Sequence, residues 1–116
     1  MARSNAAFMS GVPELVILRL LSQREMYGYE LVRAIRLASS EALSLAEGVV
    51  YPTLHSLEQR GLLKARDRVV DGRSRIYYRT TGKGDTQLSK LLGEWQRVNN
   101  GIQRILGGAN VPHRLA

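Results

Sequence analysis

The chain is organised around residues 48–63, whose sequence is GVVYPTLHSLEQRGLL. Val50, Leu54 and Leu57 are spaced by four and three residues, so they share one face of a helix and can pack on a core. The other side chains point elsewhere and are free to contact a partner. Gly61 is expected to stop the helix in a left-handed conformation, and an extended run follows directly. We therefore predict a recognition-type helix that packs on one face and ends at a sharp corner.

Pro52 is the unusual residue of this helix. A proline beyond the first turn removes a backbone hydrogen bond and usually bends the helix. The sequence therefore predicts that the helix either begins late or has a splayed first turn.

The segment that follows carries most of the excess charge. The net charge is +7, and residues 63–84 hold seven cations against two anions, which accounts for five of the seven excess charges. Such a concentration favours a polyanionic partner, and nucleic acid in particular, over a general contribution to solubility. The alternative is a solvated basic loop.

Length and composition narrow the class of protein. A chain of 116 residues suits one domain, and the absence of cysteine excludes disulfides and thiolate chemistry. No apolar run approaches the roughly 20 residues of a membrane span, and no signal peptide opens the chain. We expect a soluble, cytoplasmic protein with no membrane partner.

Catalytic and metal-binding patterns are not recognisable in the sequence. His55 and His113 are far apart and lack carboxylate or thiol neighbours, so we predict no metal site. Glu30, Glu58 and Asp85 form no acid-base pair, and there is no phosphate-binding glycine motif or nucleophile elbow. We therefore expect neither an enzyme nor a cofactor.

The residues before the central helix predict two further helices. Residues 1–10 are expected to form a flexible arm. Pro13 can open a helix that runs to about Gln23, and residues 25–30 are predicted to contain a turn. A second helix then ends near residues 39–40. The short connection that follows makes the second and third helices pack at an angle, as in a helix-turn-helix.

The residues after the central helix predict a β-hairpin. Residues 63–69 and 76–80 are read as strands, and Asp71-Gly72 is a strong turn signal. Tyr77 and Tyr78 alternate, so one is expected in the core and the other on the surface. The hairpin tip is predicted to carry the cations Arg68, Arg73 and Arg75. The expected fold is mainly α with a β-hairpin: a winged helix-turn-helix domain over residues 11–82.

The C-terminal part predicts a dimerisation helix over residues 83–107. Residues 81–85 read as a linker, and residues 108–116 as a disordered tail. Apolar residues then alternate spacings of three and four, as in a coiled-coil seam: Leu88, Leu91, Trp95, Val98, Ile102 and Ile105. A partner helix is expected on this seam. The alternative is that the helix packs back on its own domain.

Three blocks in register resemble the PadR family of bacterial transcriptional regulators, in its short form with one C-terminal helix. They are YGYEL at 27–31, EGVVYPTL with LEQRGL at 47–54 and 57–62, and RSRIYYRTTG at 73–82. The resemblance implies a homodimeric repressor that binds double-stranded DNA at a pseudo-palindromic operator and is released by a small effector.

The resemblance also implies roles for individual residues. The major groove would be contacted by Val49, Tyr51, Pro52 and His55, the backbone by Tyr29, and the flanking groove or phosphates by Arg73 and Arg75, with Arg68 beside them on the hairpin. Two positions depart from the family pattern. Val49 replaces a common hydroxyl residue, which favours a thymine-methyl contact. Ala46 replaces a common serine cap.

The effector is predicted to bind at Trp95, the only tryptophan. In a dimer two indoles at this place either stack or leave a slot for a planar aromatic compound, with Phe8, Leu91 and Leu92 as further candidate contacts. The plainer alternative is that Trp95 fills the dimer core.

Other interpretations stay open at this point. Tyr51 is equally compatible with a core aromatic. The rival function is a ligand-sensing or protein-docking module whose basic hairpin is incidental. RNA binding by a winged helix is a third interpretation.

Overall fold

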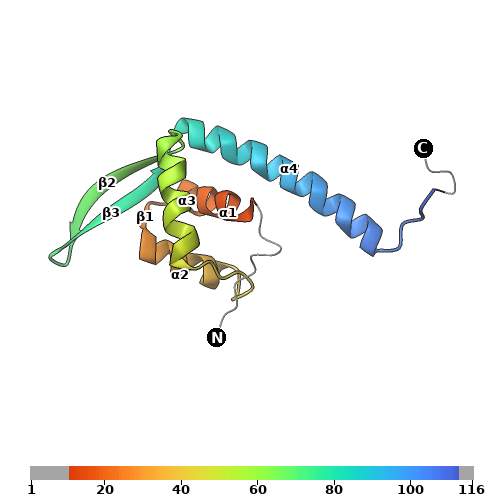
Figure 1. Ribbon diagram of the computed structural model, residues 1–116, viewed down its shortest axis with the longest axis horizontal. Helices are drawn as coiled ribbons and strands as arrows, with labels where there is room; N and C mark the ends of the chain where they lie inside the picture. The colour runs from red at the N-terminus through yellow and green to blue at the C-terminus, as the bar shows by residue number, and fades with distance from the viewer. Residues whose placement is uncertain (1–10, 113–116) are drawn as a thin grey trace.

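The computed structural model describes residues 11–112. The predicted arm at residues 1–10, which includes Phe8, and the last four residues of the predicted tail lie outside the described part. The elements in chain order are α1 (Val12–Gln23), β1 (Met26–Tyr27), α2 (Gly28–Ala38), α3 (Glu47–Gln59), β2 (Leu63–Val70), β3 (Arg73–Thr80) and α4 (Gly82–Leu106). Helices α1, α2 and α3 form a cluster from which the β2–β3 hairpin and α4 project in opposite directions (Figure 1). This is the expected winged helix-turn-helix with a C-terminal helix, and we call the hairpin the wing.

The core lies where the three short helices meet the base of the sheet. One cluster of buried apolar side chains contains Ile17 and Leu18 of α1, Leu31 of α2 and Leu54 of α3. The predicted inner face of α3 is confirmed, since Val50, Leu54 and Leu57 are all inaccessible to solvent. Burial of this face leaves the rest of α3 on the surface.

The C-terminal end of α3 is the predicted corner. Gly61 adopts a left-handed conformation with φ of +76°. Its N–H donates to the Glu58 carbonyl at 2.9 Å, and the Leu62 N–H donates to the Leu57 carbonyl at 2.9 Å. This paired arrangement satisfies carbonyls that the helix end would otherwise leave free. The chain turns into β2 directly afterwards.

Pro52 lies inside an uninterrupted α3. The helix does not begin late, because the N–H groups of Val49 and Val50 both donate to the Ala46 carbonyl, at 2.9 and 3.0 Å. The first turn is therefore closed before the proline is reached. The prediction of a late start or a splayed first turn is wrong, because the missing Pro52 N–H deprives only the Gly48 carbonyl of its helical partner.

The sheet has three strands rather than the two that were predicted. Residues Met26–Tyr27, expected within a turn, form β1 and pair with β3, which gives the antiparallel order β1-β3-β2. A strand of two residues is too short to show an alternating pattern, so the sequence could not reveal it. The β2–β3 turn is as predicted, with positive φ at both Asp71 and Gly72.

Both adjacent tyrosines of β3 are buried, which corrects the expectation that one would be exposed. Tyr78 faces the helices and belongs to the core cluster. Tyr77 faces the other side of the sheet, where it meets the Tyr27 ring edge-on at 5.4 Å and the Arg68 guanidinium at 4.5 Å. The residue that covers Tyr77 comes from the unpredicted strand.

The predicted linker at residues 81–85 is wrong, because α4 begins at Gly82. Thr81 caps the helix: its Oγ1 accepts from the Gly84 N–H at 3.0 Å and donates to the Gly61 carbonyl at 2.7 Å. A Cβ on Gly84 would overlap the Leu62 carbonyl oxygen. The glycine serves close packing of α4 on the chain after α3, not flexibility.

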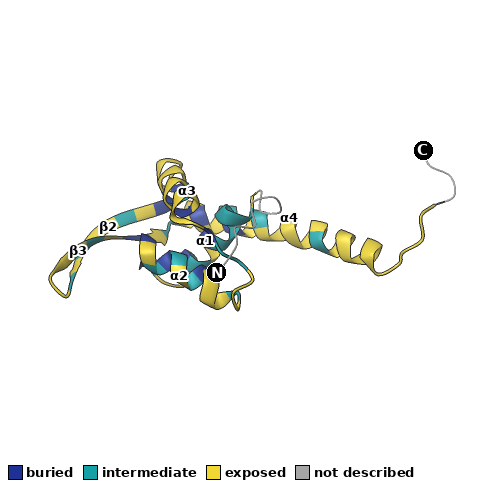
Figure 2. Cartoon of the chain, turned by 60° about the horizontal axis from the view of Figure 1, so that its bottom comes forward, coloured by how far each residue is buried: buried dark blue, intermediate teal, exposed yellow. Residues whose placement is uncertain are grey.

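Helix α4 divides into a packed part and an exposed part. Leu88 is buried and Leu91 packs against the core, whereas most later residues are exposed (Figure 2). A helix of 25 residues is about 37 Å long, so its distal half extends away from the domain. Within residues 11–112, no helix combines the length and apolarity needed to cross a membrane.

Candidate nucleic-acid interface

The outer face of α3 presents the predicted groove-contacting residues. Val49 and Tyr51 are each 36% exposed, and Pro52 and His55 are also on the surface. Their side chains offer methyl groups, a phenol hydroxyl and an imidazole. These groups can contact thymine methyls and base-edge acceptors in a major groove about 12 Å wide, which admits an α-helix.

Tyr51 is held in place by the start of α2. A Cβ added to Gly28 would lie 2.6 Å from the Tyr51 Cζ, so only glycine at this position leaves room for the ring. The ring therefore packs on one side and stays accessible on the other, which makes Tyr51 neither a core residue nor a free one. Tyr29, the second residue of α2, is 51% exposed.

The wing carries its cations on one face. In the β2–β3 register Arg68 lies opposite Arg75, Lys64 opposite Arg79 and Arg66 opposite Tyr77. Because side chains alternate across a strand, one face holds the following residues, which we call the basic face: Lys64, Arg66, Arg68, Arg73, Arg75 and Arg79. The opposite face carries Leu63 and Tyr78 into the core.

Two of the three arginines that were expected at the tip of the wing lie further along its strands. Only Arg73 flanks the turn, where it pairs with Val70, whereas Arg68 and Arg75 form the third residue pair from the turn. The Arg75 guanidinium lies 4.3 Å from the centre of the Tyr27 ring. The Tyr77 ring lies beside the Arg68 guanidinium in the same way. These two ring contacts stabilise like charges that lie directly opposite each other.

Glu25 occupies two of these arginines and was not singled out from the sequence. Its carboxylate accepts from Arg66 Nε at 2.9 Å and Nη2 at 2.6 Å, and from Arg68 Nη1 at 2.8 Å. The Arg66 hydrogen bonds, more than any other contact, hold the pKa of Glu25 below its ordinary value. Arg68 is therefore already paired with Glu25, whereas its predicted role in DNA binding assumed a free guanidinium. No sequence pattern indicates this contact, because Glu25 directly precedes the two-residue strand β1.

The seam residues of α4 have different surroundings. Trp95, Val98 and Ile102 are 46%, 44% and 49% exposed, and Ile105 is more exposed still. Leu88 and Leu91 instead pack on their own domain. The alternative expectation, that this helix packs back on its own domain, therefore holds only for the first part of α4.

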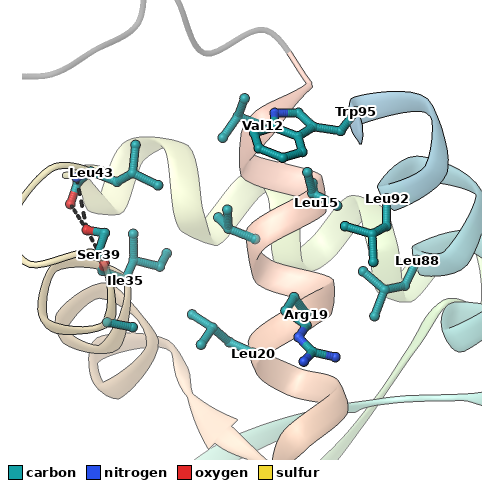
Figure 3. A pocket seen from close by; sticks show the side chains of 12 residues that line it. Val12, Leu15, Arg19, Leu20, Ile35, Ser39, Leu43, Leu88, Leu92 and Trp95 are labelled. Atoms are coloured by element: carbon teal, nitrogen blue, oxygen red, sulfur yellow. Dashed lines mark hydrogen bonds between the residues drawn. The ribbon is translucent and has the colours of Figure 1, made fainter. Parts of the chain in front are cut away.

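An apolar pocket of about 590 Å³ lies between α1, α2 and α4 (Figure 3). Helix α4 contributes Leu88, Leu92 and Trp95, and Trp95 lies at the Val12 end. Of the predicted effector contacts, Trp95 and Leu92 line this pocket and Leu91 does not. In the described residues, no cluster of three His, Asp or Glu side chains could hold a metal ion.

Comparisons with known proteins agree with this geometry. Residues 17–90 match the model of the "Transcriptional regulator PadR-like family". The chain is 34% identical to the transcriptional regulator Rv3488 from Mycobacterium tuberculosis over 101 residues, which are 87% of this chain and 89% of that protein.

Solved structures of regulators are also similar. The PadR-like transcriptional regulator BC4206 from Bacillus cereus superposes with a TM-score of 0.77 and 31% identity, covering 88% of this chain and 98% of that one. A transcriptional regulator from Clostridium thermocellum gives a TM-score of 0.78 at 28% identity, covering 84% and 96%. These relatives are transcriptional regulators rather than enzymes. The chain therefore belongs to the PadR-like family of transcriptional regulators.

Proposed function

We propose that this regulator is a homodimeric repressor that binds a pseudo-palindromic operator and is released by a planar aromatic effector. The observation that carries the proposal is the combination of an exposed α3 face, a wing with its cations on one side, and an uncovered apolar row on α4. Each part supplies one function: base contact, phosphate contact and assembly.

In the proposed complex α3 enters the major groove with Val49, Tyr51, Pro52 and His55 toward the bases. Their exposure on the face opposite the core supports this role. The wing follows the flanking backbone, and Arg73 and Arg75 neutralise phosphates. Tyr29 lies near the backbone at the start of α2. Base contacts supply sequence preference, whereas phosphate contacts supply most of the salt-dependent affinity.

The proposed dimer forms through α4. Trp95, Val98 and Ile102 are about half exposed in a single chain, and an apolar row of this kind on a soluble protein marks an interaction surface. A second copy of α4 is the natural cover, because a two-fold axis presents the same row to itself. The two α3 helices would then lie about one DNA turn, roughly 34 Å, apart.

The proposed effector site includes the pocket beside Trp95. A volume of about 590 Å³ falls within the range of roughly 300 to 1,000 Å³ typical of small-molecule sites. Aliphatic side chains and one indole make up most of the lining, which suits a flat apolar compound. Because α4 contributes both the pocket wall and the dimer row, a bound compound would shift the distance between the two wings.

A shift assay with the intergenic DNA upstream of its own gene tests this function. Wild-type protein should retard that duplex at lower concentration than a shuffled duplex of equal length and composition. Equal binding to both duplexes would reject a specific regulator, and no binding to either would favour a ligand-sensing or protein-docking module. A single-stranded RNA of the same sequence serves as the control for RNA binding.

A further inference from the structure

The Glu25 carboxylate lies between the end of α1 and the start of β1, and it bridges two cations of the basic face. Its Oε1 accepts from both Arg66 Nη2 at 2.6 Å and Arg68 Nη1 at 2.8 Å, while Oε2 accepts from Arg66 Nε at 2.9 Å. One carboxylate thus uses three guanidinium N–H groups. These are the donors that a DNA phosphate would otherwise take.

The position of Glu25 is fixed by its neighbours along the chain. Met26 and Tyr27 pair with β3, and the Tyr27 ring packs edge-on against Tyr77. Arg68 is also held in place, because its guanidinium lies 4.5 Å from the centre of the same Tyr77 ring. Backbone pairing and ring packing therefore anchor the β1 strand in addition to the ion pairs.

The cluster is open to an approaching anion. The Glu25 side chain is 21% exposed, whereas those of Arg66 and Arg68 are 60% and 39% exposed. The guanidinium groups are thus more accessible than the carboxylate that holds them. Two cations and one anion leave a single excess positive charge where the basic face would otherwise present two.

We propose that Glu25 sets the strength of DNA binding by withholding Arg66 and Arg68 from the phosphate backbone in the free protein. This inference rests on the proposed contact between the wing and DNA. On binding, a DNA phosphate must displace the Glu25 carboxylate before Arg66 or Arg68 can pair with that phosphate and release its counterion. The withheld contacts are independent of base sequence, so Glu25 acts on affinity and salt dependence and not on the choice of operator.

The test compares Glu25→Gln with wild type by fluorescence anisotropy on operator and shuffled duplexes at several salt concentrations. Freeing two arginines should steepen the slope of log affinity against log salt by up to about 1.8, because each phosphate contact contributes about 0.9. Between about 50 and 200 mM salt the variant should lose roughly tenfold more affinity than wild type. Both duplexes should be bound more tightly at low salt, with their affinity ratio unchanged.

Two further variants identify the cause. Glu41→Gln removes the same charge from an ion pair with Arg36 at 3.1 Å, away from the wing, and should leave the slope unchanged. Adding Arg66→Ala and Arg68→Ala to Glu25→Gln should cancel the gain. These two results would tie the effect to the two arginines.

Several outcomes would overturn the proposal. A slope that is equal to or flatter than the wild-type slope would mean that Glu25 positions the arginines for DNA or has only a structural role. A Glu25→Gln variant that fails to fold, judged by circular dichroism, would likewise show that the ion pairs support the sheet. Failure of wild type to bind any duplex would instead reject the proposed function itself.

Discussion

Replacing Ile102 with aspartate should dissociate the proposed dimer while leaving each chain folded. Ile102 is 49% exposed in the single chain, so about half of its side chain remains to be covered by a partner. Full burial of an isoleucine contributes about 1.5 to 3 kcal/mol, so half contributes about 1 kcal/mol. By symmetry the change occurs in both chains, which removes about 2 kcal/mol of burial from the dimer.

The introduced charge adds a second cost. Each aspartate would lose water on association without gaining a cation from the apolar row, at roughly 1 to 3 kcal/mol per group. The sum is about 4 to 8 kcal/mol, and since about 1.4 kcal/mol is a factor of ten, dimerisation should weaken at least roughly a thousandfold. The chain itself should stay folded, because Ile102 lies outside the core cluster.

Sedimentation velocity measures this directly, with Gln103→Asp as the matched control. Gln103 is the neighbouring residue on α4 and lies outside the seam, so the control adds the same charge to the same turn of the helix. Wild type and Gln103→Asp should sediment as dimers and Ile102→Asp as a monomer that no longer shifts operator DNA. A dimeric Ile102→Asp, or a monomeric wild type that binds the operator, would refute the reasoning.

The remaining predictions concern the wing, the α2–α3 contact and the pocket. Alanine at both Arg73 and Arg75 should weaken binding to all duplexes and flatten the salt slope by roughly 0.9 per lost contact; an unchanged slope in the anisotropy titration would show that these arginines do not touch phosphate. Gly28→Ala should destabilise the fold by about 1 to 3 kcal/mol in urea denaturation, because the added methyl overlaps the tyrosine ring packed there; wild-type stability would argue that the ring moves freely. Planar aromatic compounds should quench Trp95 fluorescence saturably and weaken operator binding, and Trp95→Ala should abolish that weakening. If nothing in a broad panel quenches it, Trp95 is a dimer-core residue.

Much of the fold could be predicted because its signals are local. The spacing of Val50, Leu54 and Leu57 gives the buried face of α3, and Gly61 gives its end. Asp71-Gly72 gives the wing turn in the same way. Each of these features depends on residues within one turn or one hairpin, so the sequence pattern is sufficient.

The features that escaped prediction depend on contacts between distant segments. Strand β1 exists because Met26 meets Tyr78, 52 residues later, and not because of its own pattern. The sequence predicts a linker at Gly84, yet the position needs a glycine because a Cβ there would overlap the Leu62 carbonyl oxygen. Glu25 could not be linked to Arg66 before the order of the strands was known.

The most direct test of the account is a hydroxyl-radical footprint of the wild-type protein on the intergenic DNA upstream of its gene. If two copies of α3 bind with the wings on either side, two protected half-sites related by a two-fold axis should appear, with centres about one helical turn, roughly 34 Å, apart. Each should be flanked by a shorter protected stretch that fades when salt is raised. A single protected half-site, or uniform protection without half-sites, would contradict the account.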